Sequence, residues 1–426
     1  MFARLASHFH KFRRAEDGVA LAYFAAMLFA LLGMAALAID VSHAYANRQR
    51  MQSAADAAAM SGAIAVAYAQ NEVTDGRAAS ASSGWADGAN SISVAINRPP
   101  TSGTFAGDNQ AVEAIVQQPM STSFSNLFGL AQMNVGARGV GRIPTTSYCM
   151  IALSTTGTKA FDIAGNTTIG TPSCGMASNS TQTGHTNGGF NVQGNSTVNA
   201  PIRSSGSISE PGNPVVYSAP PFPMENAPAV TDPYIANGQK AWLAGLSTSA
   251  PSPCNLANRC VNSATDGTIY DATNMALPIH FKQNTSLNGG TTIFQNGIFY
   301  FYGKLTVAGT ATLRTQNATL VLFNQLDARG ILQLSAPTSG SSSGWAIASP
   351  SNTNPNVVDI SGGNTHSLVG AIYVPNGTVK IRGNISSACA QVIANTVDVG
   401  GTVALAYNGT CGGQNATSTG VVSLVE

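Results

Sequence analysis

The stretch Ile163-Ala164-Gly165-Asn166-Thr167-Thr168-Ile169 decides the fold, because it returns along the chain with nearly the same order of residue types. An apolar residue comes first, a glycine follows two positions later, and small residues lead to a second apolar residue. Close copies are Val192–Val198 and Val307–Leu313, and weaker copies begin at Ile360, Ile381 and Val399. The last three starts lie 21 and 18 residues apart. A signature that returns at this period is typical of stacked repeats.

These repeats predict a coil of short parallel strands within residues 148–426. Each strand would pair with its equivalent in the next turn, and inward Ile and Val side chains would form a continuous core. Glycine and asparagine tolerate the backbone conformations of the corners. We therefore expect a mainly β protein with a right-handed parallel β-helix, built from Cys149–Ser209 and Gly267–Glu426. The spacing is irregular, and a β-sandwich or jelly roll remains the alternative because it also uses short glycine-rich strands.

A proline-rich excursion at residues 211–260 interrupts this domain. Nine prolines lie between Pro211 and Pro253, and a proline cannot donate a hydrogen bond to a strand ladder. The excursion should therefore be extended, with little strand pairing. We expect it to wrap the β core.

Six cysteines, all beyond residue 148, indicate an exported domain with disulfides: Cys149, Cys174, Cys254, Cys260, Cys389 and Cys411. Spacing alone does not establish their pairing. Closing a short loop loses the least chain entropy, so we favour Cys149 with Cys174, Cys254 with Cys260, and Cys389 with Cys411. The competing use is a zinc site, but the chain lacks a C-x-x-C pair and a histidine at ligand spacing.

Side chains that carry chemistry are sparse. Charged residues make up 9% of the chain, against about 25% in an ordinary globular domain. Basic and acidic residues balance beyond residue 150, so no field favours nucleic acid as a partner. Asp162, Asp359 and Asp398 each stand between two core residues, and stacking could align them as a calcium or acid site. Outward, solvated positions explain these aspartates equally well.

We predict no catalytic residue, no metal site and no cofactor. Gly340–Gly344 matches the pattern G-x-S-x-G, but it lies in a Ser/Gly-rich loop and not in a turn between a strand and a helix. His185, His280 and His366 stand alone in the sequence and are expected at the surface or in turns.

Upstream of the β domain, residues 18–70 predict one long helix. Asp40–Gln70 contains no proline and one glycine and is dominated by alanine, the strongest helix former. Small residues recur on it at steps of three or four and form a stripe on which another helix could pack closely: Ala55, Ala58, Gly62, Ala65 and Ala69. The alternative is that this stripe packs on the protein's own next domain.

That next domain, residues 71–147, has the pattern of a small α+β unit. Apolar residues alternate in Ser91–Ile96, Ala111–Val116 and Met133–Val140, which predicts three strands. A short helix is expected within Ser121–Leu130. The unit would cap the long helix.

The run Val19–Ile39, VALAYFAAMLFALLGMAALAI, contains 21 uncharged and mostly apolar residues. As a helix it would be ~32 Å long, which matches the hydrocarbon core of a bilayer. Four basic residues precede the run, while only Arg48 and Arg50 follow it closely. The positive-inside rule therefore places residues 1–17 in the cytoplasm and the later domains outside. The alternative is a signal peptide cleaved after Ala36-Leu37-Ala38, but the run exceeds an ordinary signal core.

Three segments around this run carry a resemblance to a known family: Arg13–Gly18 (RRAEDG), Ala38–Val41 (AIDV) and Arg50–Ala63 (RMQSAADAAAMSGA). They resemble the N-terminal segment of TadG-like proteins of the bacterial tight-adherence (Flp) pilus assembly system. The resemblance implies a single-pass inner-membrane protein with a periplasmic domain. Its implied partners are the inner membrane and other pilus-assembly or secretion-machine proteins. The resemblance leaves open whether the protein also forms a homo-oligomer.

One departure from related proteins affects the expected mechanism. Related pilins carry a glycine, four further residues and then Glu-Tyr, and the glutamate helps the subunit to enter a filament. Here Gly18 is followed by Val19–Ala22 and then by Tyr23 and Phe24. An ionisable residue at that depth is retained only for a purpose, so its absence argues against pilin-like filament packing.

Two classes of function follow. The favoured one is a non-enzymatic, membrane-anchored component of pilus assembly that docks pilus or secretion-machine subunits. The alternative is a β-helical adhesin or polysaccharide lyase that binds or cleaves envelope polysaccharide.

Overall fold

The computed structural model describes residues 17–143, 145–170, 174–217, 223–274, 279–350, 356–387, 389–406, 417–419 and 423–425. The chain forms two compact units. The first contains Met1–Val66, Gln70–Ile143 and Val422–Glu426, and the second contains Ala67–Ala69 and Pro144–Val421. The expected mainly β structure with a long N-terminal helix is confirmed.

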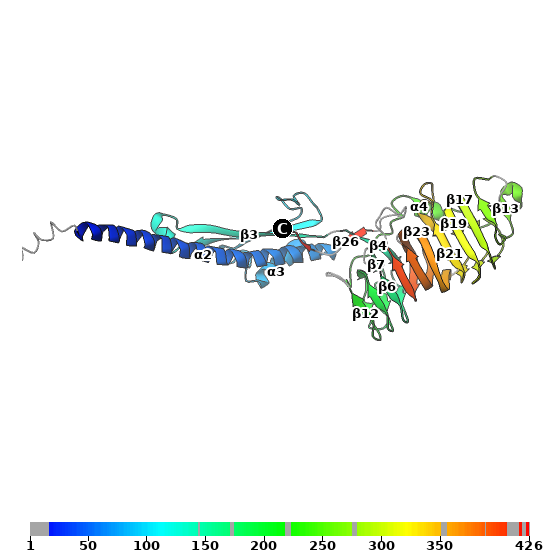
Figure 1. Cartoon of the computed structure of the whole chain (residues 1–426), viewed down its shortest axis with the longest axis horizontal. Coiled ribbons are helices and arrows are strands. Elements are labelled where there is room, and N and C mark those ends of the chain that lie inside the picture. Colours follow the sequence, from blue (N-terminus) through cyan, green and yellow to red (C-terminus); the bar gives the residue numbers. More distant parts are fainter. Residues whose placement is uncertain are drawn as a thin grey trace, which may run out of the picture. The chain divides into compact units, whose positions relative to one another are not determined.

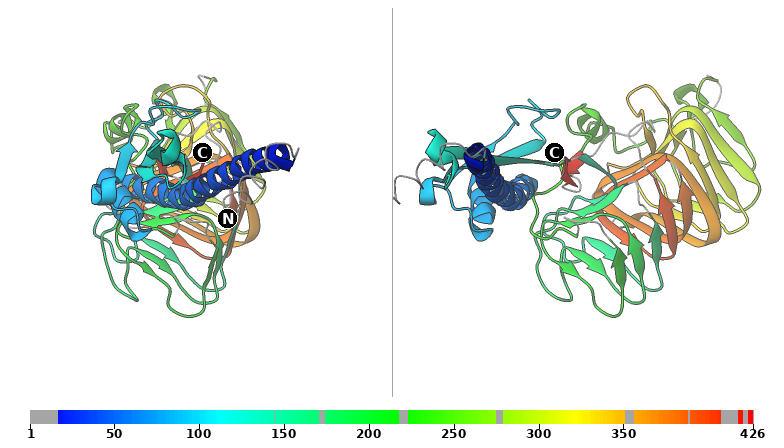
Figure 2. Two further views of the ribbon diagram at one scale, coloured as in Figure 1. Left: turned by 90° about the vertical axis from the view of Figure 1, so that its left-hand side faces the viewer. Right: turned by 60° about the vertical axis from the view of Figure 1, so that its left-hand side comes forward.

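The first unit combines the long helix α2, Asp17–Ala67, with an antiparallel sheet. The sheet order is β1 (Ser93–Asn97), β2 (Ala111–Ser121), β3 (Gln132–Arg142) and β27 (Ser423–Leu424). Three further short elements are α3 (Glu72–Ser82), η1 (Ala89–Ser91) and η2 (Ser125–Phe128). Figure 1 shows β3 running beside α2, and Figure 2 shows the same unit with α2 viewed nearly along its axis.

The sheet packs on α2 through glycines. A Cβ atom on Gly141 would lie 2.6 Å from the carbonyl oxygen of Ala59, and one on Gly139 would lie 2.8 Å from Oδ1 of Asp56. Real side chains do not fit at these distances, so only glycine lets β3 approach the helix backbone so closely. Val112, Val116 and Val135 complete the core between helix and sheet.

The second unit is a large sheet of mainly short parallel strands. Its first part contains three columns of strands: β7 pairs with β4 and β10, β8 pairs with β5 and β11, and β9 pairs with β6 and β12. These strands are β4 (Thr145–Ala152), β5 (Phe161–Ile163), β6 (Thr168–Gly170), β7 (Gly175–Ser178), β8 (Phe190–Val192), β9 (Thr197–Asn199), β10 (Ile202–Ser204), β11 (Ile208–Ser209) and β12 (Val215–Tyr217).

The later strands form further layers of the same sheet, and Figure 1 shows β17, β19, β21 and β23 side by side. They are β13 (Cys260–Val261), β14 (Ile269–Asp271), β15 (His280–Phe281), β16 (Thr285–Leu287), β17 (Thr291–Phe301), β18 (Leu305–Val307), β19 (Thr312–Leu322), β20 (Leu326–Ala328), β21 (Ile331–Ser335), β22 (Trp345–Ala348), β23 (Asn356–Ser387), β24 (Cys389–Val399), β25 (Thr402–Leu405) and β26 (Thr417–Thr419). Their pairings are parallel, except that β26 pairs antiparallel with β4.

The C-terminal layers pair with the first layer of the unit, although the two are far apart in the chain. β24 pairs with β4 and β5, and β25 pairs with β6. In Figure 2 the green strands of residues 145–217 accordingly continue the stack of the orange and red strands. We call this junction the seam.

The repeated signature occupies equivalent positions across the seam. Ile381 pairs with Val399, Val399 with Ile163, and Ile163 with Val192. At the corner that follows, Gly165 and Gly194 have φ of +87° and +77°, a conformation that favours glycine. A Cβ on Gly194 would lie 2.6 Å from the carbonyl oxygen of Gly165. The repeat therefore marks a corner at which successive layers touch through their backbones.

The inward residues of all layers form one continuous core. Equivalent aromatic rings stack between layers, such as Phe161 on Phe190 with centroids 4.4 Å apart, and Phe281 on Phe301 at 4.7 Å. The predominance of parallel pairs does not fit a jelly roll or sandwich, whose neighbouring strands are antiparallel. The closure and right-handed winding of a parallel β-helix stay a prediction.

The proline-rich excursion runs back along the outside of the stack. β12 ends the layers on one side and β13 begins those at the other end, so the chain between Tyr217 and Cys260 has to return over the sheet. Val230, Tyr234 and Leu243 pack with a row of outward residues from Ala177 in β7 to Val321 in β19. The excursion contains a short helix, α4 (Gln239–Ala244), and is followed by η3 (Leu256–Asn258) before β13. We call Pro223–Gly245 the cover.

Replacing Gly141 with alanine should destabilise the first unit by roughly 1–3 kcal/mol, because the new methyl group would force β3 away from α2. Denaturant unfolding of the full-length chain in detergent micelles would measure the loss. The control is Gly170→Ala in β6, where an added Cβ has no atom within 4 Å and stability should hardly change. Equal stability of the two variants would contradict close packing of the sheet on the helix.

Candidate functional site

The N-terminal half of α2 presents its apolar side chains to the surroundings. Phe29 is 75% exposed, Leu21 71% and Leu32 61%. Among the described residues, α2 is the one helix long and apolar enough to cross a membrane. Exposure of so many large apolar side chains is unfavourable in water, which is consistent with a helix that crosses a membrane once.

Asp40 ends the apolar run and holds a loop from the sheet. Its Oδ1 accepts the backbone N–H of Ser123 at 3.1 Å, and its Oδ2 accepts those of Phe124 at 3.0 Å and Ser125 at 2.7 Å. These amides open the short helix η2, where backbone N–H groups lack partners within the helix. Sequence reasoning gave Asp40 no role of its own. The available signal was an acidic residue placed directly after an apolar run.

The stripe of small residues is covered by the chain itself. Ala55 and Ala58 are fully buried, and Ala65 is 1% exposed. A Cβ on Gly62 would lie 2.9 Å from Cγ1 of Val112 in β2. Ala69 lies beyond the end of α2 and is exposed. The first four residues of the stripe are therefore buried within the unit, where α3 also approaches: a Cβ on Gly76 would lie 3.1 Å from the carbonyl oxygen of Ala58.

A buried ion pair lies at the other end of the sheet. Glu113 in β2 is fully buried and accepts hydrogen bonds from Arg138 Nε at 2.6 Å, Thr101 Oγ1 at 2.7 Å and Asn97 Nδ2 at 2.9 Å. Burial alone would raise the pKa of Glu113, but these donors outweigh it and lower the pKa to about 2. Arg138 thus neutralises a carboxylate that fastens the loop before β2.

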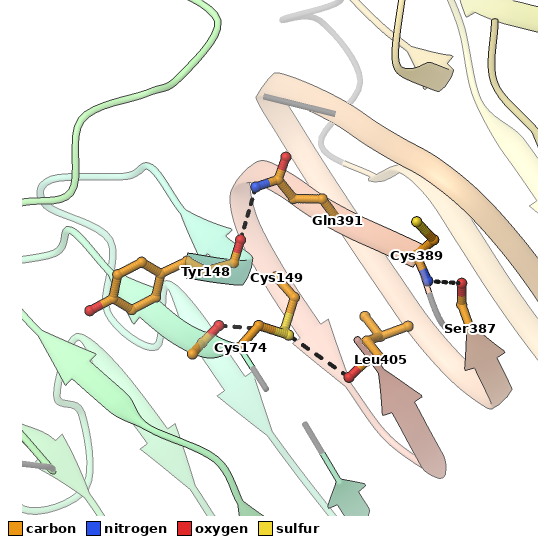
Figure 3. The surroundings of a disulfide bond; sticks show 8 residues. Tyr148, Cys149, Cys174, Ser387, Cys389, Gln391 and Leu405 are labelled. Atoms are coloured by element: carbon orange, nitrogen blue, oxygen red, sulfur yellow. Dashed lines mark hydrogen bonds between the residues drawn. A yellow bond between two sulfur atoms is a disulfide. The ribbon is translucent and has the colours of Figure 1, made fainter. Parts of the chain in front are cut away.

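The cysteines link neighbouring parts of the second unit. Cys149 is bonded to Cys174 with Cα atoms 5.5 Å apart, and Cys254 to Cys260 with Cα atoms 4.9 Å apart. The first bond lies in the core beside the seam, where Gln391 Nε2 donates to the carbonyl of Tyr148 at 2.8 Å (Figure 3). Cys389 is also in a disulfide, and its expected partner, Cys411, lies outside the described residues.

Two of the three aspartates come together across the seam. Asp162 in β5 is in register with Asp398 in β24. Arg382 Nη2 donates to Asp398 Oδ1 at 2.7 Å, and Asn191 Nδ2 donates to Asp162 Oδ1 at 2.6 Å. Burial, with a smaller effect from the charge of Asp398, raises the pKa of Asp162 against the hydrogen bond from Asn191. The site therefore consists of two neighbouring carboxylates, Asp162 and Asp398, with the guanidinium of Arg382 bound to Asp398.

The third aspartate, Asp359, lies in a different layer and is in register with Asp327 of β20. Its charge reaches Arg382, whose pKa is raised first by the hydrogen bond to Asp398 and then by Asp162 and Asp359. Among the residues that the structure describes, no group of three His, Cys, Asp or Glu side chains is arranged to hold a metal ion.

The expected surface position of one histidine is wrong. His366, in β23, is 1% exposed. Its imidazole lies inside the stack of layers, where Nδ1 accepts a hydrogen bond from the backbone N–H of Leu332 at 3.3 Å. Burial lowers the pKa of His366. His280 is half-buried and stacks on Tyr300 at 4.8 Å, while His185 is exposed in a turn.

The cover is fastened by a polar cluster that sequence reasoning missed. Asp232 Oδ2 accepts a hydrogen bond from the hydroxyl of Tyr373 at 2.8 Å and one from Lys240 Nζ at 3.0 Å. Tyr373 is fully buried, and burial followed by the charge of Asp232 raises its pKa far above the usual range. Asn179 adds two hydrogen bonds to the backbone of Val230, each 2.8 Å long.

Comparison with known proteins bears on the N-terminal part. Residues 18–81 match the family model described as "Putative Flp pilus-assembly TadE/G-like". No curated protein and no solved structure matches the chain. The matched residues form α2 and α3 almost in full, so the resemblance to TadG-like Flp pilus proteins is confirmed for this part of the chain.

Replacing Glu113 with glutamine should lower the stability of the first unit at pH 7 by roughly 3 kcal/mol, from 1.36 kcal/mol per pKa unit. Because the pKa is depressed in the folded state, from 4.5 to about 2, this stabilisation is complete above about pH 4.5 and is lost as the pH falls towards 2. Hydrogen exchange of the β2 and β3 amides in the full-length chain would measure both variants at pH 7 and pH 3.

The control for this experiment is Glu72→Gln at the start of α3, which removes a half-buried carboxylate in the first helical turn and should lose at most about 1 kcal/mol. A deficit for Glu113→Gln that is as large at pH 3 as at pH 7 would show that shape, and not charge, accounts for the effect.

Proposed function

We propose that the protein is a non-enzymatic component of Flp pilus assembly, anchored in the bacterial inner membrane by α2, with residues 1–17 in the cytoplasm and the chain beyond Asp40 in the periplasm. The family match over residues 18–81 carries this proposal. It is supported by the exposed apolar face of α2 up to Ile39, which needs a lipid environment.

The orientation rests on charge and on cysteine chemistry. Four basic residues, Arg4, Lys11, Arg13 and Arg14, precede the apolar run, against Arg48 and Arg50 shortly after it, and the more basic flank stays in the cytoplasm. Disulfides such as Cys149–Cys174 persist in the periplasm and not in the cytoplasm. Both observations support export of the β units.

The second unit would supply the docking surface. The small-residue stripe of α2 is occupied by β2 and β3, which favours the outer β surface as the place where pilus or secretion-machine subunits bind. We propose that its parallel layers wind as a right-handed β-helix, whose stacked edges offer a long rigid surface. The missing glutamate after Gly18 supports an anchored factor over a filament subunit.

Fractionation of cells that carry a C-terminal tag tests this proposal. The intact chain should sediment with membranes and resist alkaline extraction, and protease should remove the tag only after the outer membrane is opened. Purification through the tag in mild detergent should enrich pilus-system proteins. A soluble intact chain, or a tag protected in osmotically opened cells, would contradict the anchor and its orientation; loss of pilus-system proteins alone would contradict the docking role.

A second function is favoured by one observation, the in-register pair Asp162 and Asp398 with Arg382 beside it. Paired carboxylates can act as acid and base on a polysaccharide. If the protein cleaves an envelope glycan, Asp398→Asn and Asp162→Asn should each abolish cleavage, whereas Asp266→Asn, in a loop outside this pair, should retain it. Full cleavage by Asp398→Asn would exclude this role for the pair.

A further inference from the structure

The hairpin of β2 and β3 is uncharged over its distal part. No Asp, Glu, Lys or Arg occurs from Ala114 to Ala137, although Glu113 and Arg138 flank this stretch as an ion pair. The loop that joins the strands carries four large apolar residues, Phe124, Leu127, Phe128 and Leu130. Leu130 is 62% exposed and Phe124 is 39% exposed. We call Ser121–Gln132 the hairpin tip.

The hairpin tip is held level with the end of the apolar run. Asp40 follows Ile39 directly and accepts the amides of Ser123, Phe124 and Ser125. Asp40 is 8% exposed although it lies at the end of a strongly exposed segment. Since a hydrogen bond fixes the two groups within about 3 Å, the tip and the exit of α2 lie at one depth.

That depth is the membrane interface if α2 spans the bilayer. The 21-residue run before Asp40 equals the thickness of a hydrocarbon core of about 30 Å, so Asp40 emerges at the headgroup boundary. We infer that the hairpin tip is a second membrane contact, which rests in the headgroup region of the outer leaflet through Phe124 and Leu130 and whose depth Asp40 sets. This inference rests on the proposed function, because it needs α2 in the membrane.

The backbone of the tip is suited to that position. Apart from the three amides bound by Asp40, Gly129 N donates to Asn126 at 3.0 Å and Leu130 N to Ser125 at 3.1 Å. Backbone groups that already have partners lose less on leaving water. The exposed apolar side chains of the tip continue the lipid-facing surface of α2 without an intervening charge, which favours lipid over a protein partner as the occupant.

Tryptophan quenching in vesicles tests the contact. The full-length variant Leu130→Trp would be reconstituted in phosphatidylethanolamine and phosphatidylglycerol with and without phosphatidylcholine brominated on its acyl chains. After subtraction of the parent signal, its fluorescence should fall at least about twofold with brominated lipid, because an apolar side chain in the interface reaches the boundary between headgroups and acyl chains. Phe124→Trp should give the same result if Leu130→Trp folds poorly.

Two controls separate this inference from the anchor itself. Ala106→Trp lies in the loop at the opposite end of β2, ~34 Å from the tip by strand rise, and should not be quenched. Leu31→Trp lies within the apolar run and should be quenched strongly. If Leu31→Trp is unquenched, the anchor fails; if it is quenched while Leu130→Trp and Phe124→Trp are not, the second contact is overturned and the tip is left for a protein partner.

The role of Asp40 has its own readout. In the Leu130→Trp background, Asp40→Ala should reduce quenching at the tip while the matching change in the Leu31→Trp background leaves quenching there unaltered. Asp40→Asn keeps one acceptor oxygen and should restore part of the effect. Unchanged quenching in Asp40→Ala would show that this carboxylate does not set the depth of the tip.

Discussion

The parallel register at the seam is the constraint on which the second unit depends. Val397 pairs with Phe161 and Val403 with Ile169, so strands more than two hundred residues apart in the chain share one core. Such long-range pairing closes a very large loop, which costs chain entropy. This cost is offset only when the inward side chains of the paired strands are buried together. The disulfide between Cys149 and Cys174 lies beside this junction and limits how far its first layer can open.

The seam also explains why the cover exists. Because the C-terminal layers return to the first layer, the chain has to cross the length of the stack once without joining its ladders. Prolines suit that crossing since they prevent strand pairing. The outward aromatic side chains that would otherwise be exposed are covered, with Tyr234 against Trp345 at 5.2 Å and against Tyr373 at 4.6 Å. One segment thus connects the layers and completes the outer packing of the sheet.

The local elements were predictable from the sequence, and the long-range ones were not. The repeat identified the corners, because Gly194 approaches the backbone of Gly165 too closely for a side chain, and alternation identified β1, β2 and β3. The order of layers was hidden, because equivalent apolar residues can pair in any order. His366 was misplaced for a similar reason: a lone polar residue in β23 carries no sign of whether its side of the strand faces inwards.

The contact of Asp40 with the hairpin tip could not be foreseen either, since it depends on the length of β2 and β3 relative to α2. The length of the hairpin explains how charge is distributed along it. Glu113 and Arg138 hold the end of the sheet that lies away from Asp40, where a buried ion pair with several donors is stable. Charges nearer the tip would have to leave water wherever the tip approaches lipid. The hairpin reaches the point where α2 leaves the bilayer, and two features of the sequence follow from this. The hairpin carries no charge between Glu113 and Arg138, and one acidic side chain, Asp40, lies where the helix and the hairpin meet.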